Sequence, residues 1–219
     1  MSVQTAAEHT SVEPSSAPIA RWVFLAGHEI RFGLPGLCTV LEGSAEIVAH
    51  AEPPLSRRNR LVRIIGPGQL VLLPLEVPAG MPANGIRLLA ARECTVHFVA
   101  WDALDELWAG DPAYGARLLA IAARSVRETQ NAVAALTQYD VAGRLARELL
   151  IMRRRDGRTV PGGVRVEHGL TQGELADLVG ASRETACRVL NRFAVRGWIR
   201  FDRASVTILS PAGLASRIR

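Results

Sequence analysis

Apolar and polar residues alternate in short runs over residues 21–100, and glycine or proline separates the runs. The runs are LCTVLEGSAEIVAH, with a turn at Gly43, RLVRIIGPGQLVLL, with a turn at Gly66–Gly68, and IRLLAARECTVHFVA. Alternation with a period of two is typical of strands with one buried face, and frequent turn signals are typical of antiparallel sheets. We expect an antiparallel barrel or sandwich over residues 21–110. Residues 1–20, rich in Ser, Ala, Thr and Pro, are expected to form a disordered arm.

The pattern becomes helical at Trp101, first in the short segment WDALDELW and then over residues 111–138. Asp111 and Pro112 suit the N-cap and the first position of the long helix. Along this helix, residues recur with spacings of three and four, namely Leu119, Ala122, Val126, Thr129, Val133 and Leu136. This heptad spacing favours a two-helix dimer seam. The alternative is a helix that packs on its own domain.

Residues 139–219 begin with a break in the helical pattern at Tyr139–Asp140, and Asp140 is a candidate hinge. The next segment, VAGRLARELLIMRRR, predicts a second amphipathic helix that ends at Asp156–Gly157. Strands followed by these helices define an α+β chain. The expected domains are thus the arm, a β domain over residues 21–110, the long helix and a C-terminal domain over residues 139–219.

The stretch LTQGELADLVGASRETACRVLNRF predicts two short helices that meet at Gly180. Thr171 and Glu174 have the spacing of a capping box, and Ser182 can cap the second helix. Gly197 suits the left-handed residue that ends a helix. The following WIRFDRASVTIL predicts a β-hairpin. Two helices and a hairpin in this order predict a winged helix-turn-helix.

The second of these helices carries Arg183, Glu184 and Arg188 near its N-terminal end, on the face opposite its apolar stripe. In a helix-turn-helix, this part of the second helix reaches base edges in the major groove of double-stranded DNA. Arginine can bond guanine bidentately, and glutamate can accept from the cytosine amino group. In the hairpin, Arg200 and Arg203 are candidates for phosphate contacts.

Charge is distributed unevenly along the chain, and all 26 basic residues are arginine. Residues 140–219 carry 15 arginines against 8 acidic residues, a net charge of +7, whereas residues 1–139 carry 11 against 13. A basic C-terminal third indicates that the polyanion-binding part lies at one end. The alternative is a basic domain that is merely soluble.

The sequence gives little support for a secreted protein, a membrane protein or an enzyme. Cys38, Cys94 and Cys187 are scattered and odd in number, which suits a reducing cytoplasm better than a disulfide framework. No run of about 18 apolar residues predicts a membrane span. The first residues lack the pattern of an export signal. Patterns typical of enzymes, such as HExxH or a phosphate loop, are missing from the sequence, so we expect no enzyme.

The C-terminal motif and the segment QYDVAGRLARELL together resemble the Crp-Fnr superfamily of bacterial transcription regulators. The segments LCTVLEGSAEIV and IIGPGQ resemble the β-roll of that family, which is similar to cyclic-nucleotide-binding domains. The resemblance implies a homodimer that reads palindromic DNA, with the long helix as dimerisation helix, Asp140 at the hinge and RNA polymerase as a partner. It places RExxxR, here Arg183, Glu184 and Arg188, at the base-reading positions. The expected phosphate contacts are Thr171, Ser182, Thr185, Arg192, Arg200 and Arg203.

The resemblance weakens at the nucleotide pocket. The family has a Gly-Glu pair soon after the glycine turn and then an Arg-Ser or Arg-Thr pair, but this chain has Leu72–Leu73 and about Asn84–Gly85. A ribose needs an acceptor and a cyclic phosphate needs a cation or several amides. Arg87 or Arg92 could substitute as the cation. We nevertheless expect that cyclic AMP does not control this protein, and the effector is unknown.

Other sensor groups are also disfavoured. An iron–sulfur cluster normally needs four clustered cysteines. Haem could use His28, His50 or His97, but a lone histidine in a β domain is more often structural. Cys38 and Cys94 lie in strand-like runs and are expected to be small core residues. The alternative to DNA reading is a protein-interaction module whose basic domain docks a partner.

Overall fold

The computed structural model describes residues 3–5, 18–50, 59–73, 85–202 and 204–218. The chain divides into two compact units, Met1–Thr129 and Gln130–Arg219. The long helix α2 (Pro112–Gln138) contributes residues to both units. Each unit is therefore described separately.

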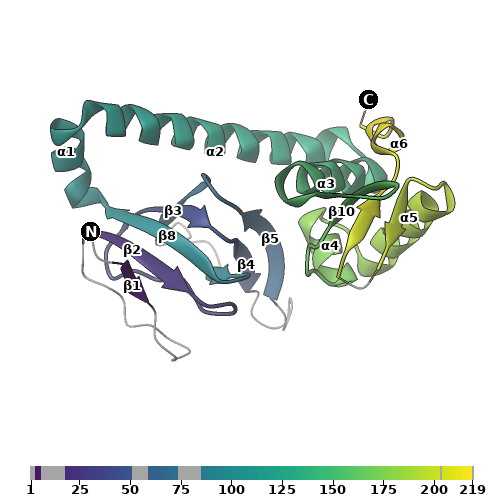
Figure 1. Cartoon of the computed structure of the whole chain (residues 1–219), viewed down its shortest axis with the longest axis horizontal. Helices are drawn as coiled ribbons and strands as arrows, with labels where there is room; N and C mark the ends of the chain where they lie inside the picture. The colour runs from purple at the N-terminus through teal and green to yellow at the C-terminus, as the bar shows by residue number, and fades with distance from the viewer. Residues whose placement is uncertain (1–2, 6–17, 51–58, 74–84, 203, 219) are drawn as a thin grey trace. The chain divides into compact units, whose positions relative to one another are not determined.

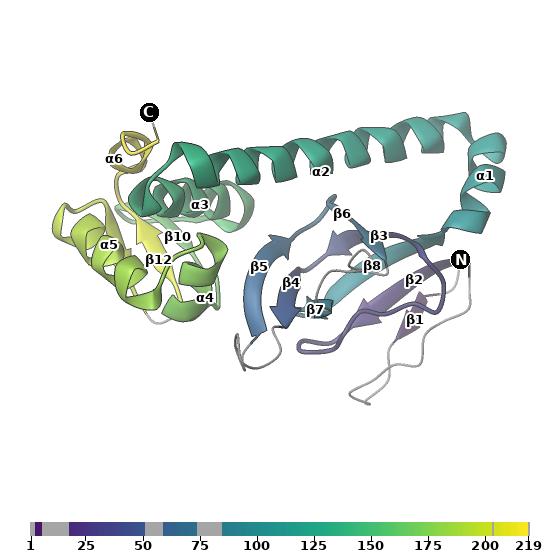
Figure 2. The ribbon, with the colours of Figure 1, turned by 180° about the vertical axis from the view of Figure 1, so that it is seen from behind.

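The first unit is built from two sheets (Figure 2). The larger sheet has the strand order β1 (Val3–Thr5), β2 (Ile19–Phe24), β8 (Cys94–Ala100), β3 (Gly36–Glu42) and β6 (Leu70–Leu73). The smaller sheet has the order β5 (Asn59–Ile65), β4 (Ala45–His50) and β7 (Gly85–Ala90). All pairings are antiparallel except that of β1 with β2. The expected antiparallel β domain is confirmed.

The turn at Gly43 passes the chain from one sheet to the other, because β3 and β4 belong to different sheets. Gly43 has a φ of 75°, and a side chain there would collide with the backbone of Glu93 and Cys94. Only glycine fits both the left-handed backbone and this close approach. The core includes Phe24, Phe98 and Leu88, and Phe32 stacks on Phe98 with ring centroids 4.0 Å apart.

Part of the predicted arm has regular structure. Val3–Thr5 pairs with Arg21–Val23, and β2 begins at Ile19, inside the segment expected to be disordered. The difference arises because backbone hydrogen bonds to a neighbouring strand form with almost any side chain, and composition does not reveal them. Residues 1–2 and 6–17, which make up most of the predicted arm, lie outside the described residues.

Two helices follow β8 directly, α1 (Trp101–Gly110) and then α2 (Figure 1). Asp111 precedes α2, and its Oδ1 accepts from the Tyr114 amide at 3.1 Å. The predicted cap and the predicted start at Pro112 are thus confirmed. Of the six seam positions, Leu119, Val126, Val133 and Leu136 are each more than half exposed in the single chain. Thr129 is exposed as well, and Ala122 is half-buried.

The second unit has four further helices and a small sheet among its described residues. The helices are α3 (Val141–Asp156), α4 (Gln172–Leu178), α5 (Arg183–Val195) and α6 (Pro211–Ala215). The antiparallel sheet has the order β11 (Ile199–Phe201), β12 (Val206–Ile208), β10 (Gly163–Val166) and β9 (Arg158–Val160). The predicted hairpin is β11–β12. Sequence patterns missed β9, β10 and α6, because three to five residues hold too few apolar positions to show a period.

Candidate nucleic-acid interface

Helix α4 starts at a complete capping box. The Thr171 hydroxyl accepts from the Glu174 amide at 3.2 Å, and the Glu174 carboxylate accepts from the Thr171 amide at 2.7 Å. These two bonds satisfy amides that have no partner within the helix. On the inner face, Leu175 and Ala176 are buried. The cap and the apolar face together fix where α4 begins and which side it buries.

The turn between α4 and α5 contains Gly180, which has a φ of 59°. This left-handed conformation costs glycine little and other residues more, so the turn depends on glycine. After the turn, the Ser182 hydroxyl accepts from the Thr185 amide at 3.2 Å and donates to the Thr185 hydroxyl at 2.9 Å. The predicted N-cap of α5 is confirmed.

Helix α5 has an apolar stripe on one side and charged side chains on the other. Ala186, Val189, Leu190 and Phe193 are buried. In contrast, Arg183, Glu184 and Arg188 are exposed, and none of them forms a salt bridge with a described residue. Their functional groups are thus available to an external partner. The first turns of α5 bring the three predicted base-reading residues to one surface.

Five of the six predicted phosphate contacts are described, and all five belong to the second unit. Thr171, Ser182, Arg192 and Arg200 are exposed, and Thr185 is half-buried. The hairpin that carries Arg200 closes with a bond from the Asp202 amide to the Ser205 carbonyl at 2.9 Å. Arg203 lies outside the described residues. The side chains of Thr171, Ser182, Arg192 and Arg200 are therefore open to solvent, as a phosphate contact requires.

Two contacts in this unit were not predicted from the sequence. The Cys187 thiol, half-buried on α5, donates to the Gln172 side-chain oxygen on α4 at 2.8 Å. Arg144, on α3, donates from Nε to the Val179 carbonyl at 2.7 Å and from Nη1 to the Tyr139 carbonyl at 2.8 Å. Neither has a sequence signal, since the partners are far apart in the chain and Arg144 bonds backbone atoms.

The candidate hinge residue Asp140 caps α3. Its Oδ1 accepts from the Gly143 amide at 2.7 Å, and its Oδ2 pairs with Arg217 Nη2 at 2.6 Å. Tyr139 and Asp140 are the break between α2 and α3. The break predicted from the sequence is therefore present, and the aspartate stabilises the start of the next helix.

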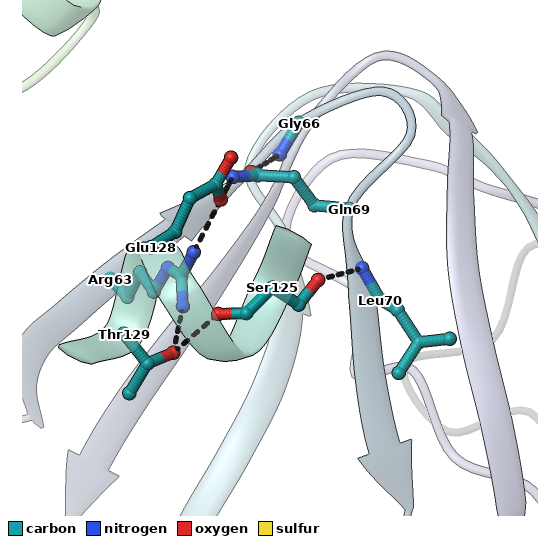
Figure 3. A network of polar contacts seen from close by, with 7 residues as sticks. All are labelled: Arg63, Gly66, Gln69, Leu70, Ser125, Glu128 and Thr129. Atoms are coloured by element: carbon teal, nitrogen blue, oxygen red, sulfur yellow. Dashed lines mark hydrogen bonds and ion pairs between the residues drawn. The ribbon is translucent and has the colours of Figure 1, made fainter. Parts of the chain in front are cut away.

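A polar network in the first unit fastens the turn between β5 and β6 to α2 (Figure 3). Arg63 donates from Nη1 to the Thr129 hydroxyl at 2.7 Å and from Nη2 to the Glu128 carboxylate at 2.8 Å. The Gln69 amide group donates to the same Glu128 oxygen, while its own oxygen accepts from the Gly66 amide at 2.7 Å. The network thus holds α2 with side chains from both ends of the glycine turn.

The sensor-chemistry candidates are scattered through the first unit. Cys38 and Cys94 are buried in the core as expected. Burial raises the pKa of Cys94 to about 11 and raises that of Cys38 further, so both thiols are protonated near neutral pH and unreactive. His28 Nδ1 lies 3.1 Å from the Leu25 carbonyl oxygen, and His97 is half-buried beside Tyr114. The His50 side chain lies outside the described part.

The positions where the sequence pattern places the nucleotide pocket of the family are apolar where the structure describes them. Leu72, on β6, is about half exposed, and Leu73 is buried. Asn84, the first residue of the second pair, lies outside the described ranges, and Gly85 is the first residue of β7. Neither leucine side chain offers an acceptor for a ribose hydroxyl.

Comparison with known proteins shows which protein family the chain belongs to. The Crp-like helix-turn-helix domain family matches residues 143–217. A CRP-like cAMP-activated global transcriptional regulator of Mycobacterium tuberculosis is 36% identical over 211 residues, which cover 95% of this chain and 89% of that protein. The chain therefore belongs to the Crp-Fnr family of DNA-binding transcription regulators, a family of regulators and not of enzymes.

Solved structures agree on the fold. FixK2 from Bradyrhizobium japonicum matches with a TM-score of 0.70 at 19% identity and covers 92% of this chain and 98% of its own. A CRP/FNR-family regulator from Thermus thermophilus matches with a TM-score of 0.68 at 23% identity and covers 90% of this chain and 97% of its own. At these identities the two structures support the fold alone.

Among the described residues, no helix is both long enough and apolar enough to span a membrane.

Proposed function

We propose that this regulator binds palindromic double-stranded DNA as a homodimer and reads each half-site with the first turns of α5. The observation that carries the proposal is the exposed surface of Arg183, Glu184 and Arg188 at the capped start of a helix whose other side is buried. In this geometry the arginines can bond guanine, and the glutamate can accept from a cytosine amino group.

Side chains around α5 then hold the DNA backbone. The proposed phosphate contacts are Thr171, Ser182, Thr185, Arg192, Arg200 and Arg203. Hydroxyl groups at helix starts and guanidinium groups are common donors to phosphate oxygens. Because each cation displaces counterions, affinity falls steeply as salt concentration rises.

The two copies associate along α2. The proposed seam is Leu119, Ala122, Val126, Thr129, Val133 and Leu136. Four of these side chains are large, apolar and more than half exposed in the single chain, which is unfavourable unless a partner covers them. A second copy of α2 presents the same stripe, so an isologous two-helix contact buries both. Residues 111–138 act as the dimerisation helix between a sensor-like domain at 21–110 and the DNA-binding domain at 139–219.

Cyclic AMP is not the proposed effector, although the printed name of the Mycobacterium tuberculosis relative describes cAMP activation. Leu72 and Leu73 stand where the family has its Gly-Glu pair, and an apolar pair cannot accept from a ribose. A thermal-unfolding series tests this point. We expect an unchanged midpoint at millimolar cyclic AMP, whereas a ligand that binds only the folded protein raises the midpoint.

The remaining parts of the proposal are the cellular compartment, the partner protein and the hinge. The protein acts in the cytoplasm, where DNA and a reducing environment are found, and RNA polymerase is its partner at promoters. Asp140 is the hinge between the dimerisation helix and the reading unit. These assignments follow from family membership and from the free thiols Cys38, Cys94 and Cys187.

Selection of sites from a random duplex library tests the function directly. We expect the purified protein to enrich a palindrome, and Arg183→Ala to lose about 1–3 kcal/mol at one base pair of each half-site while discrimination at that pair relaxes. Arg196→Ala is the matched control, because Arg196 lies at the far end of α5 over the Trp198 ring at 5.0 Å. Equal loss on every sequence makes Arg183 a phosphate contact only. Failure to enrich any site favours the protein-interaction module.

A further inference from the structure

The last turns of α2 lie in the same compact unit as the reading helices, since that unit spans Gln130–Arg219. These turns carry Val133 and Leu136 of the proposed seam. The contacts that join the end of α2 to α4 and α5 therefore determine how a dimer presents its reading helices to DNA.

Arg144 makes one of these contacts. Its guanidinium donates to the Tyr139 carbonyl, just after α2, and to the Val179 carbonyl, which ends α4. Its Nη2 also lies 3.5 Å from the Gly180 carbonyl oxygen. Carbonyls at a helix C-terminus lack partners within the helix and carry partial negative charge, so a cation there is favourable. One planar group thus ties the α2 end to the turn before α5.

A second contact joins the same two places. A Cβ built on Gly180 would lie 3.7 Å from Leu136 Cδ2, so the seam leucine lies over the helix-turn-helix turn. Leu136 is still 54% exposed, which leaves much of its side chain for a partner helix. The seam therefore comes close to the turn at this one leucine.

We propose that Arg144 is a positioning residue that fixes the reading helix relative to the dimer seam and thereby sets the spacing between half-sites that the dimer accepts. The inference rests on the proposed function, because it requires a dimer along α2 and base reading by α5. Arg144 does not itself contact DNA in this proposal. Its fork geometry matters, since a single cation at that place cannot bond two separate carbonyls equally well.

DNA geometry makes spacing a sensitive measure of this role. Half-sites one turn apart are about 10 bp and 34 Å apart, so each inserted base pair rotates one half-site by roughly 36° about the axis. A dimer with firmly held reading helices cannot follow that rotation. A dimer with loosened helices can follow it in part.

The experiment compares affinities for a palindrome that the wild-type protein selects from a random duplex library and for the same palindrome respaced by −1, +1 and +2 bp. For the wild type, we expect each respaced duplex to bind about tenfold more weakly or worse, comparable to loss of a base contact. For Arg144→Gln, we expect weaker binding to the selected site but a spacing preference of less than about threefold, because the freed helices regain those contacts.

Arg147→Gln is the matched control, since it removes the same charge from the next turn of α3. It should keep the wild-type spacing preference. Arg144→Lys retains the charge without the fork and should fall between the wild type and Arg144→Gln. Circular dichroism and half-site sequence preference of each variant establish that α5 is folded and reads the same bases. If Arg144→Gln unfolds, the lysine variant alone decides the question.

The outcomes separate the two proposals. If Arg144→Gln or Arg144→Lys binds every spacing more weakly by the same factor, or binds all of them as the wild type does, the spacing preference is unchanged. That result overturns the positioning role and leaves DNA reading intact. If the wild type selects no palindrome or remains monomeric, the proposed function fails before the positioning role is reached.

Discussion

Each of the two compact units holds helix α2 with one arginine, but the two arginines use different acceptors. In the first unit, Arg63 bonds the side chains of Glu128 and Thr129 on α2. In the second, Arg144 bonds the backbone carbonyls of Tyr139 and Val179. The first attachment therefore requires particular residues on both sides, whereas the second requires only the arginine and the backbone path.

This difference determines how readily each attachment can change. A single substitution at Glu128 or Thr129 can weaken the first, and added salt screens its ion pair, whose side chains are 25% and 36% exposed. No substitution can remove the acceptors of Arg144. We infer that the attachment of α2 to the β unit is the more adjustable one, and that the attachment to the reading unit is the more constant.

The largest expected effect comes from the proposed dimer seam on α2. Val126→Glu places a carboxylate in the middle of the proposed seam, where an unpaired buried charge costs about 3–5 kcal/mol. We expect dissociation to monomers by analytical ultracentrifugation, together with a large loss of DNA affinity. Gln130→Glu, an exposed α2 position outside the seam, is the control. A stable Val126→Glu dimer would place the interface elsewhere.

Breaking the Arg63 attachment should have the next largest effect. Arg63→Met leaves the half-buried Glu128 carboxylate without its cation, which costs about 1–3 kcal/mol of unfolding free energy. Urea unfolding measures it, with Arg60→Met on the same strand as control. In combination with Glu128→Gln, the two losses should be less than additive, as for residues in one network. Fully additive losses would show that the ion pair contributes nothing of its own.

The cap of α5 allows stability and DNA binding to be separated in the second unit. Ser182→Ala removes the bond to the Thr185 amide and should cost about 1 kcal/mol of stability. Ser182→Asp can keep the cap, so stability should stay near the wild-type value, but its negative charge should repel phosphate and weaken DNA binding. If Ser182→Asp binds DNA as tightly as the wild type, Ser182 does not approach the DNA backbone.

The smallest expected effect is on how the stability of the first unit depends on pH. Burial, with Arg21 nearby, lowers the pKa of His97 below its usual value of 6.5. The folded state thus favours the neutral ring, and the stability that His97 contributes is present above pH 6.5 and lost as pH falls through the lowered value. His97→Phe should flatten this part of a stability–pH curve while keeping the aromatic contact with Tyr114. An unchanged slope in this variant would assign the titration to another group.

Local signals in the sequence predicted the second unit better than the first. The caps at Thr171 and Ser182, the turn at Gly180 and the stop at Gly197 each depend on neighbours within a few residues, and all are present. In the first unit, strand-like runs were visible, but their division between two sheets was not, because pairing joins segments far apart in the chain.

The contacts that matter most to the proposals could not be predicted from the sequence. Arg63 and Glu128 are 65 residues apart, and Arg144 and Val179 are 35 apart. An arginine that bonds a carbonyl leaves no complementary residue type for a pattern to detect. By contrast, the base-reading triplet could be predicted because its three members share one face of one helix.

Cys187 has a practical consequence. Of the three thiols, two are buried in the first unit, and only this half-buried one lies on the reading helix, beside Ser182, Arg183 and Glu184. A maleimide dye should therefore label the native protein selectively at that position. Fluorescence quenching on titration with duplex, or protection from labelling when duplex is added first, would then report occupancy in real time without an engineered cysteine.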